Sequence, residues 1–313
     1  MLIPMTAVDP LDELEIKVFL TCNVPPLPAP LRRGCFARAR RLAVTPPFCL
    51  VTGGSSGIGL ALAEALQARG CRLVVIGRDA GRLAAAEARL TPLGPVPPET
   101  LALDVTDSAA VRAAMEALLA RYGAPSWVVT SAGIAWPGRF LDQPLIEHEA
   151  QWQTNYLGTL NVLHALAPAM ARAGRGQVIL ISSAAALAGF AGYSAYAPAK
   201  WALRGLGDIL SIELGAHGVR VLTAFPPDTD TPQLAEERAR RPAFTARFAA
   251  GNKALSPAFV AASILRAADR GRRHVAPGFG ASLLLLAGVP FARYLEALQR
   301  RLLRRHPEDF RPP

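Results

Sequence analysis

A glycine-rich loop that begins at Gly53 constrains the fold of this chain more than any other stretch. The sequence Val51-Thr52-Gly53-Gly54-Ser55-Ser56-Gly57-Ile58-Gly59 follows an apolar run and opens an amphipathic one. Strand, glycine turn and helix in this order are typical of a dinucleotide-binding loop, in which glycines let the backbone approach a pyrophosphate at the helix N-terminus. We therefore expect a dinucleotide to bind to Gly53, Ser55, Ser56, Gly57, Ile58 and Gly59.

A structural turn without a ligand and the P-loop of a nucleotide triphosphatase are the alternatives for this loop. A P-loop needs Lys followed by Ser or Thr after its glycines, to bind phosphate and magnesium. Leu60-Ala61 occupies that place, which argues against an NTPase. The glycine spacing is GxxxGxG and not GxGxxG, so the loop alone does not decide between a binding site and a plain turn.

The composition is that of a basic, globular protein. The 313 residues are 51% hydrophobic and carry a net charge of +10, which favours anionic partners. No nucleic-acid-binding motif is present, so we expect no nucleic-acid partner. The five histidines are scattered and the four cysteines form no CxxC pair, which predicts no metal site and reduced thiols in a cytoplasmic protein.

Apolar, β-branched segments alternate with segments of helical period along the chain. We expect strands at 48–50, 72–77, 101–104, 127–130, 177–183 and 219–225, and helices at 60–66, 80–90, 108–122, 144–173 and 194–215. This alternation implies a parallel sheet covered by helices on both faces. The predicted fold is a single doubly wound α/β domain, a Rossmann fold, with a C-terminal helical extension.

The residues that follow the second and third strands predict the cofactor, because ligands bind such sheets at the carboxyl ends of the strands. Arg78 stands where a carboxylate would bind the ribose 2′-hydroxyl of NAD, and a guanidinium can instead bind the 2′-phosphate of NADP. Arg82, one helical turn later, adds a second positive charge. The sequence therefore favours NADPH/NADP, with Asp79 as the residue that would serve NAD. Asp104 is expected at the adenine amine or as a helix cap.

A serine, a tyrosine and a lysine follow the fifth strand. Tyr196 and Lys200 are four residues apart and share one helical face, and Ser183 ends the strand before them. A free tyrosine has a pKa of about 10 and is a poor acid–base catalyst at neutral pH. An adjacent ammonium favours the phenolate, so we expect Lys200 to lower the pKa of Tyr196, and Ser183 to hydrogen-bond the substrate oxygen.

Together these motifs resemble the short-chain dehydrogenase/reductase family over residues 48–276. The resemblance implies that Tyr196 protonates a carbonyl oxygen or deprotonates an alcohol. It further implies that Lys200 holds the nicotinamide ribose and that Ser183 polarises the carbonyl. Asn155 matches the asparagine that supports a proton relay from a kinked helix, with a local helix hydrogen bond as the alternative. Members of this family often form dimers or tetramers, so we expect a homo-oligomer.

Three further segments are similar to the 3-ketodihydrosphingosine reductases of that family. They are residues 189–196, 203–206 and 224–232. The similarity implies NADPH-dependent reduction of the 3-keto group of a long-chain amino ketone in sphingolipid biosynthesis. A reductase or dehydrogenase for another lipid-like ketone or alcohol (acyl, retinoid or steroid) is the alternative, and a non-catalytic NADP-binding regulator is the third hypothesis.

Four carboxylates follow the sixth strand, on a segment where a substrate lid would close. They are Asp228, Asp230, Glu236 and Glu237. Their charge would attract the ammonium group of an amino ketone. A solvated loop with helix-capping acids is the competing interpretation.

These patterns divide the chain into one domain and two extensions. Residues 1–46 form a basic, Pro/Arg-rich extension, residues 47–276 the NADP-binding catalytic domain, and residues 277–313 an apolar and amphipathic extension. The last part is expected to begin with an apolar hairpin, because glycines and Pro290 interrupt it before it reaches the roughly 20 apolar residues of a spanning helix.

A basic amphipathic helix is expected after the hairpin. Its apolar face carries Phe291, Leu295, Leu298 and Leu302, and arginines occupy the opposite face. This pattern suits peripheral attachment to the cytoplasmic face of an anionic membrane. Packing between subunits is the alternative.

Overall fold

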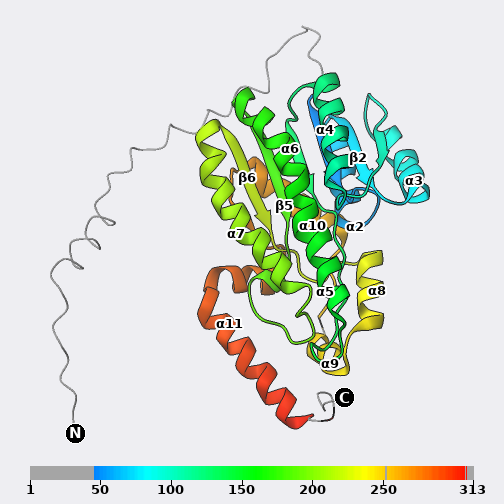
Figure 1. The fold of residues 1–313 in the computed structure, drawn as a ribbon. Helices are drawn as coiled ribbons and strands as arrows, with labels where there is room; N and C mark the ends of the chain where they lie inside the picture. Colours follow the sequence, from blue (N-terminus) through cyan, green and yellow to red (C-terminus); the bar gives the residue numbers. More distant parts are fainter. Residues whose placement is uncertain (1–45, 251, 307, 309–313) are drawn as a thin grey trace, which may run out of the picture. The chain divides into compact units, whose positions relative to one another are not determined.

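The computed structural model describes residues 46–250, 252–306 and 308. The predicted N-terminal extension lies outside these residues except for Pro46, and so do Cys22 and Cys35. Strands and helices alternate along the described part of the chain (Figure 1). The strands are β1 (Phe48–Thr52), β2 (Arg72–Gly77), β3 (Glu99–Ala102), β4 (Trp127–Thr130), β5 (Gly176–Ile181), β6 (Val219–Ala224) and β7 (His274–Val275).

The longer helices begin at positions that the local sequence marks. They are α2 (Gly57–Ala68), α3 (Ala80–Leu90), α4 (Ser108–Tyr122), α5 (Leu145–Trp152), α6 (Gly158–Ala173), α7 (Ala197–Glu213), α8 (Pro232–Arg240), α9 (Ala243–Ala249), α10 (Pro257–Asp269) and α11 (Phe279–Arg305). Asp79, Asp107, Thr231 and Ser256 each accept a backbone N–H at the start of a helix. Such a cap satisfies a helix N–H that has no partner within the helix, and so fixes where the helix begins.

The strands form one parallel sheet in the order β3-β2-β1-β4-β5-β6-β7. The chain builds outward from β1 in one direction as far as β3, and then returns to add β4 on the other side of β1. The loops after β1 and β4 therefore diverge to opposite faces of the sheet. The crevice between them is where ligands bind in folds of this kind.

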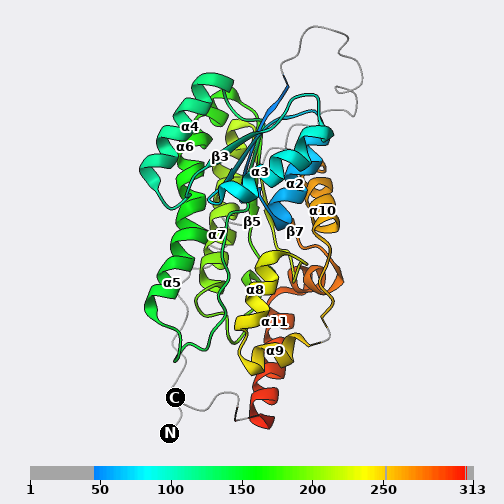
Figure 2. The same ribbon diagram turned by 90° about the vertical axis from the view of Figure 1, so that its right-hand side faces the viewer.

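Helices cover both faces of the sheet, as Figure 2 shows. On one face Val51 of β1 packs with Leu66 of α2 and Ile264 of α10. On the other face Leu50 packs in a cluster that includes Met115 of α4. Neighbouring strand residues point to opposite faces, so a strand that is buried on both sides reads as one continuous apolar run.

The predicted doubly wound parallel sheet is confirmed. The bounds of β2, β4 and α4 coincide with the predicted ones. The third strand begins at Glu99, two residues before its predicted start, because Glu99 and Thr100 pair with β2 despite their polarity. The seventh strand was not predicted: His274 and Val275 pair with β6 but are too short a run to show any periodicity.

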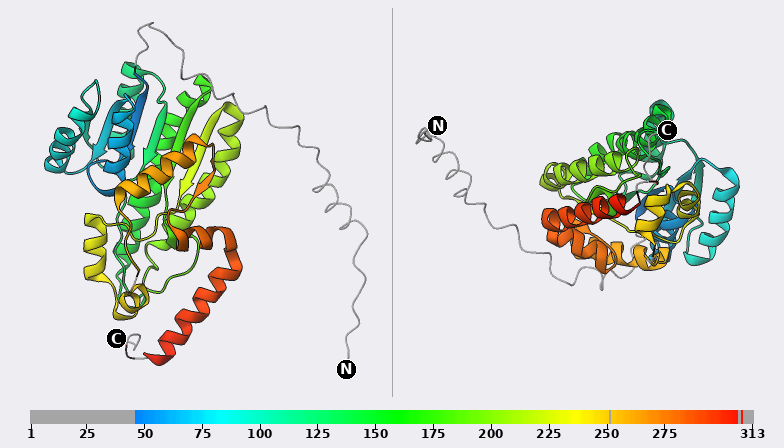
Figure 3. Two further views of the ribbon diagram at one scale, coloured as in Figure 1. Left: turned by 180° about the vertical axis from the view of Figure 1, so that it is seen from behind. Right: turned by 90° about the horizontal axis from the view of Figure 1, so that it is seen from below.

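The apolar segment after residue 277, predicted as a hairpin, is helical on both sides of a break at Gly288 within α11. A sharp bend at Gly288, with φ 56° and ψ −133°, divides the helix in two (Figure 3). By length and composition, α11 is the one helix of the described residues that could cross a membrane, and 11% of its apolar window is buried. The bend leaves each half shorter than the roughly 20 residues of a straight span.

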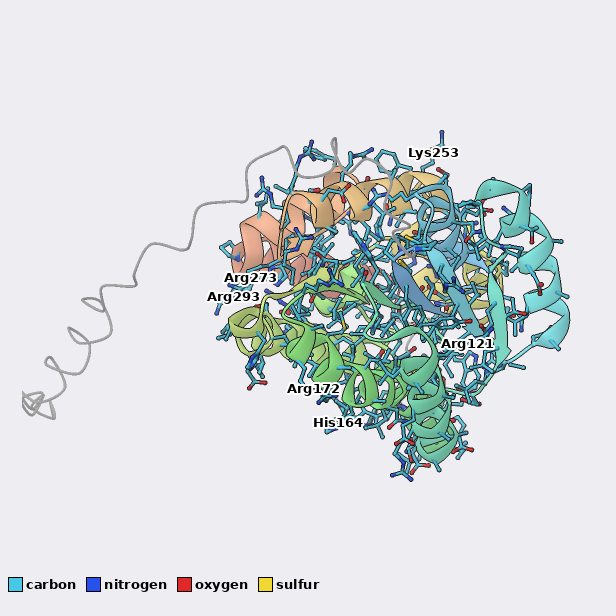
Figure 4. The ribbon with its side chains drawn as sticks, turned by 90° about the horizontal axis from the view of Figure 1, so that it is seen from above. Arg121, His164, Arg172, Lys253, Arg273 and Arg293 are labelled. Atoms are coloured by element: carbon cyan, nitrogen blue, oxygen red, sulfur yellow. The ribbon has the colours of Figure 1, made fainter. Side chains whose placement is uncertain are left out.

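Positive side chains are spread over the described surface. Figure 4 shows Arg121 on the right of the view, Arg172 at its lower edge, and Arg273 and Arg293 both on the left. They belong to separate elements: α4, α6, the turn before β7, and α11. Within the part of the chain that the structure describes, these four arginines do not form a single basic stripe.

Candidate functional site

A cavity of about 900 Å³ opens at the carboxyl ends of the strands. The loops after β1 to β6 line it, together with residues of α8, α9 and α11. Because parallel strands all end at the same edge, residues far apart in sequence meet here. The cavity therefore brings the predicted cofactor loop and the predicted reacting side chains into one space.

The glycine loop is packed so tightly that side chains cannot replace its glycines. A Cβ on Gly53 would lie 2.6 Å from the backbone nitrogen of Ala132, and a Cβ on Gly59 would collide with the carbonyl of Gly53. Gly53 and Gly57 also have positive φ angles of 64° and 54°, which favour glycine.

The loop leads into the N-terminus of α2, whose first turn carries no acidic side chain. The N-cap Ser56 makes no side-chain capping bond, so its hydroxyl is available to a ligand. Ser55, Ser56, Gly57 and Ile58 all line the cavity. A pyrophosphate binds where the backbone can approach it, where helix N–H groups are free and where no carboxylate competes. This loop therefore fits the predicted dinucleotide.

The charged residues after β2 and β3 lie together at the rim of the cavity. A nitrogen of Arg78 is 3.8 Å from a carboxylate oxygen of Asp104, and both side chains are exposed. Asp79 accepts the backbone N–H of Arg82 at 2.8 Å and so caps α3. Asp104 accepts two hydrogen bonds from Thr106, and it therefore holds the turn before α4. Arg82 is likewise exposed and lies 3.5 Å from a carboxylate oxygen of Asp79, so both arginines are held only by exposed ion pairs that an anionic ligand can replace.

Tyr196 and Ser183 lie next to each other in the cavity wall. Tyr196 immediately precedes α7 and is only 8% exposed. The Ser183 hydroxyl is hydrogen-bonded to the Tyr196 phenol and also accepts the backbone N–H of Ala185 at 3.1 Å. The two hydroxyl groups can therefore approach the same substrate oxygen.

Lys200 is buried below the tyrosine. Its Nζ donates to the carbonyl of Ile181 at 3.0 Å and lies 5.6 Å from the centre of the Tyr196 ring. The Ser182 hydroxyl donates to the carbonyl of Lys200 at 2.8 Å, which ties β5 to α7. Burial lowers the pKa of Lys200 to about 8.

The expected lowering of the Tyr196 pKa is not what the structure gives. Burial, and then the carboxylates of Glu237 and Asp228, raise the pKa of Tyr196, and only the hydrogen bond with Ser183 opposes them. The physical reason is that the carboxylates act on a phenol that is shielded from water. Tyr196 is therefore a neutral phenol at neutral pH, ready to donate a proton.

Asn155 lies behind the cavity and does not line it. It sits in a single π-helical turn, Gln153–Leu157, between α5 and α6. Its amide accepts the N–H of Ile134 and donates to the carbonyl of the same residue, both at 2.9 Å. Asn155 thus fixes the loop after β4, which faces the cavity, and its side chain has no contact with the cavity itself.

A buried network of charged side chains joins α8 to the loop before Tyr196. The sequence did not indicate that these side chains would contact one another. Arg241 donates to both oxygens of Asp228 at 3.0 and 2.8 Å, and to Glu237 at 2.8 Å. The Tyr193 hydroxyl donates to Glu237 at 2.5 Å and accepts from Arg241 at 3.0 Å. All four side chains line the cavity.

The network separates the four acids that were expected to act together. Asp228 and Glu237 belong to it, Glu236 lines the cavity from an exposed position, and Asp230 is exposed and outside the lining. Two carboxylates against one guanidinium leave one negative charge beside Tyr196. The only sequence feature that could have indicated this network is Glu237, a glutamate on the buried side of α8.

No group of three or more His, Cys, Asp or Glu side chains that could hold a metal ion occurs among the described residues. The described cysteines, Cys49 and Cys71, are both free and buried in the core.

Comparisons with known proteins agree with this geometry. The family profile described as short chain dehydrogenase matches residues 48–242. A 3-ketodihydrosphingosine reductase of Bos taurus is 30% identical over 266 residues, which cover 83% of this chain and 80% of that protein. A 3-ketodihydrosphingosine reductase of Dictyostelium discoideum is 33% identical over 244 residues, covering 72% and 73% respectively.

Solved structures show the same likeness in three dimensions. A short-chain dehydrogenase of Sphingobium yanoikuyae in complex with NADPH superposes with a TM-score of 0.68 at 28% identity. The match covers 85% of this chain and 96% of that one.

Proposed function

The chain belongs to the short chain dehydrogenase family, and we propose that it reduces the 3-keto group of 3-ketodihydrosphingosine to dihydrosphingosine in sphingolipid synthesis, with NADPH as reductant. The observation that carries the proposal is Tyr196, a buried neutral phenol hydrogen-bonded to Ser183, beside a carboxylate network with one excess negative charge. Such a site suits a ketone whose neighbouring carbon bears an ammonium group.

NADPH would lie along the glycine loop, with its 2′-phosphate at Arg78 and Arg82. When bound, its reduced nicotinamide supplies the hydride. Ser55 and Ser56 and the backbone N–H groups at the start of α2 bind the pyrophosphate, and Asp104 accepts from the adenine amine. Lys200 lines the cavity, with its Nζ 3.4 Å from the place that a Cβ on Gly133 would take, and would hold the nicotinamide ribose.

Tyr196 is the proton donor in this direction of the reaction. Its hydroxyl gives a proton to the carbonyl oxygen as that oxygen gains negative charge, and the Ser183 hydroxyl hydrogen-bonds the same oxygen. An ammonium on Lys200, 5.6 Å from the centre of the Tyr196 ring, stabilises the phenolate that remains and so favours the proton transfer to the substrate. Asn155 would support a proton relay indirectly, because its amide holds Ile134 and the loop after β4 in place.

Glu237 and Asp228 would bind the substrate ammonium. Arg241 already holds one oxygen of Glu237, and the Tyr193 hydroxyl donates to that same oxygen, Oε1. The other oxygen of Glu237 can accept from an amine in the cavity. Burial raises the pKa of Glu237, and the hydrogen bonds from Tyr193 and Arg241 oppose that shift by favouring the carboxylate.

A peripheral contact with the cytoplasmic face of a membrane fits the lipid substrate. In α11, Leu286, Val289 and Tyr294 are exposed beside the arginines of the helix, and Phe279 is exposed at the cavity. Apolar side chains flanked by basic ones bind the surface of anionic bilayers. A homo-oligomer is also proposed, supported by exposed apolar residues on α5 and α7: Leu145, Ile146, Ile209 and Ile212.

Replacement of Tyr196 with Phe tests the mechanism. The variant keeps the ring but loses the proton donor, so kcat for 3-ketodihydrosphingosine should fall by at least about a hundredfold. NADPH binding, followed by the fluorescence of the reduced nicotinamide, should stay within about threefold of the wild type, which shows that the cavity is intact. A variant that binds NADPH and turns over at the wild-type rate would refute the role of Tyr196.

A further inference from the structure

The inward face of α11 forms one wall of the substrate cavity. Ala281 and Leu284 from its first half and Phe291, Leu295 and Leu298 from its second half line the cavity. The last three recur with the spacing of one helical face, and from Phe291 to Leu298 they span about 10 Å along the axis. The apolar stripe that suggested a membrane or subunit contact is therefore turned toward the protein's own cavity.

Apolar side chains connect this wall to the reacting tyrosine. Phe190 packs in a cluster with Tyr196 and also against the cluster that contains Leu284 and Leu295. Phe190 also faces Phe248 of α9, with ring centres 6.1 Å apart. Phe190 and Phe248 both line the cavity, so an unbroken apolar surface runs from Tyr196 to α11.

A buried glutamine holds α11 against the loop before Tyr196. The Gln299 side chain accepts the N–H of Ala191 at 2.9 Å and donates to the carbonyl of Gly189 at 2.8 Å. Gln299 is 5% exposed, so both bonds are shielded from water. These bonds flank Phe190 and fix its position between α11 and Tyr196.

We propose that α11 is the binding wall for the alkyl chain of the substrate, with Phe190 leading the chain from Tyr196 to Leu295 and Leu298. The inference rests on the proposed function, because it assigns the alkyl end of that function's lipid substrate to a binding surface. The carboxylate network takes the polar end of the substrate and α11 takes the apolar end. Gln299 is a positioning residue that keeps the wall in place.

Substitution of Leu298 with Trp tests the proposal by filling the wall. The indole would displace part of the alkyl chain from the wall. Each methylene that is no longer buried weakens binding about fourfold, so kcat/KM for the long-chain substrate should fall by at least about tenfold. A truncated analogue, which keeps the amino ketone but ends before α11, should change by less than about twofold. Leu93→Trp is the control for the same exchange, because Leu93 is 42% exposed and does not line the cavity.

Leu298→Ala is the second variant, since a smaller side chain cannot clash and the fold is retained. It should lower kcat/KM for the long-chain substrate several-fold and leave the truncated analogue unchanged. Thermal melting and NADPH binding establish that each variant is folded.

Equal losses with both substrates in Leu298→Trp, or no loss with either, would overturn the assignment of α11. A wild-type protein that reduces neither amino ketone would instead refute the proposed function. The two failures are therefore distinguishable in one set of assays.

Discussion

Two sets of charged side chains line the same cavity, and they differ in burial. At the cofactor end, Arg78 is 59% exposed and 3.8 Å from Asp104. At the substrate end, Arg241 is 6% exposed and binds Asp228 and Glu237 at 2.8 Å. Arginine–carboxylate pairs occur in both sets, but the first is exposed to water and the second is largely shielded, with Asp228 27% exposed.

The difference indicates two modes of recognition. Exposed ion pairs are worth little, so Arg78 can exchange Asp104 for a phosphate at small cost. A buried pair is costly to break, because the partner that remains has lost its solvation. We infer that the cofactor end adapts to its ligand, whereas the substrate end is built in advance.

The largest expected effect is on stability. Arg241→Met leaves Asp228 and Glu237 buried without their guanidinium, which should cost about 3–5 kcal/mol. That loss corresponds to a fall in melting temperature of about 10 °C. Arg78→Met is the matched control and should change stability by less than about 1 kcal/mol. Equal melting temperatures for the two variants would contradict the claim that the Arg241 network stabilises the fold more than the exposed Arg78 pair does.

A smaller effect is expected on substrate selection. Glu237→Gln keeps the shape of the side chain and removes its charge. The ratio of kcat/KM for the amino ketone to that for the same ketone without its amino group should fall about tenfold, the size of one charge-assisted hydrogen bond. Glu236→Gln, on the exposed side of α8, is the charge-matched control and should shift the ratio much less.

The same variant has a second readout in its pH profile. The Glu237 carboxylate raises the pKa of Tyr196, so its removal lowers that pKa. The phenol then loses its proton at a lower pH, so the decline of kcat on the alkaline side of the profile should begin at a lower pH. An alkaline limb that stays in place or moves upward would contradict the coupling between Glu237 and Tyr196.

The smallest effect is expected at the cofactor end. Arg78→Ala should raise KM for NADPH about five- to tenfold and leave KM for NADH within about twofold. The increase should shrink as salt is added, because exposed charges are screened. Arg112→Ala removes an exposed arginine of α4 outside the cavity and should have no effect. Similar KM changes for NADPH and NADH would remove Arg78 from phosphate recognition.

The sequence was sufficient for the sheet and for most of the cavity because those signals are local. β2 and β4 are continuous apolar runs, and their ends place Arg78 and the loop after Thr130 at the cavity without further information. Tyr196 and Lys200 are one helical turn apart, so their shared face follows from helix geometry alone.

The network around Arg241 could not be predicted, because its members come from separate elements that only the fold brings together. Tyr193 precedes α7, Asp228 follows β6, and Arg241 follows α8. The pKa of Tyr196 was misjudged for the same reason, since its direction depends on Glu237. The apolar stripe of α11 was recognised correctly, but periodicity cannot say whether such a face meets a bilayer, a subunit or the protein's own cavity.

The most direct test of the account is one assay with the purified protein. Oxidation of NADPH is followed with 3-ketodihydrosphingosine in mixed micelles, beside NADH at the same concentration, and the lipid product is identified by mass spectrometry. The account predicts dihydrosphingosine as the product and a clear preference for NADPH. NADPH binding without conversion of this ketone would contradict it, and would turn attention to another lipid-like ketone or alcohol.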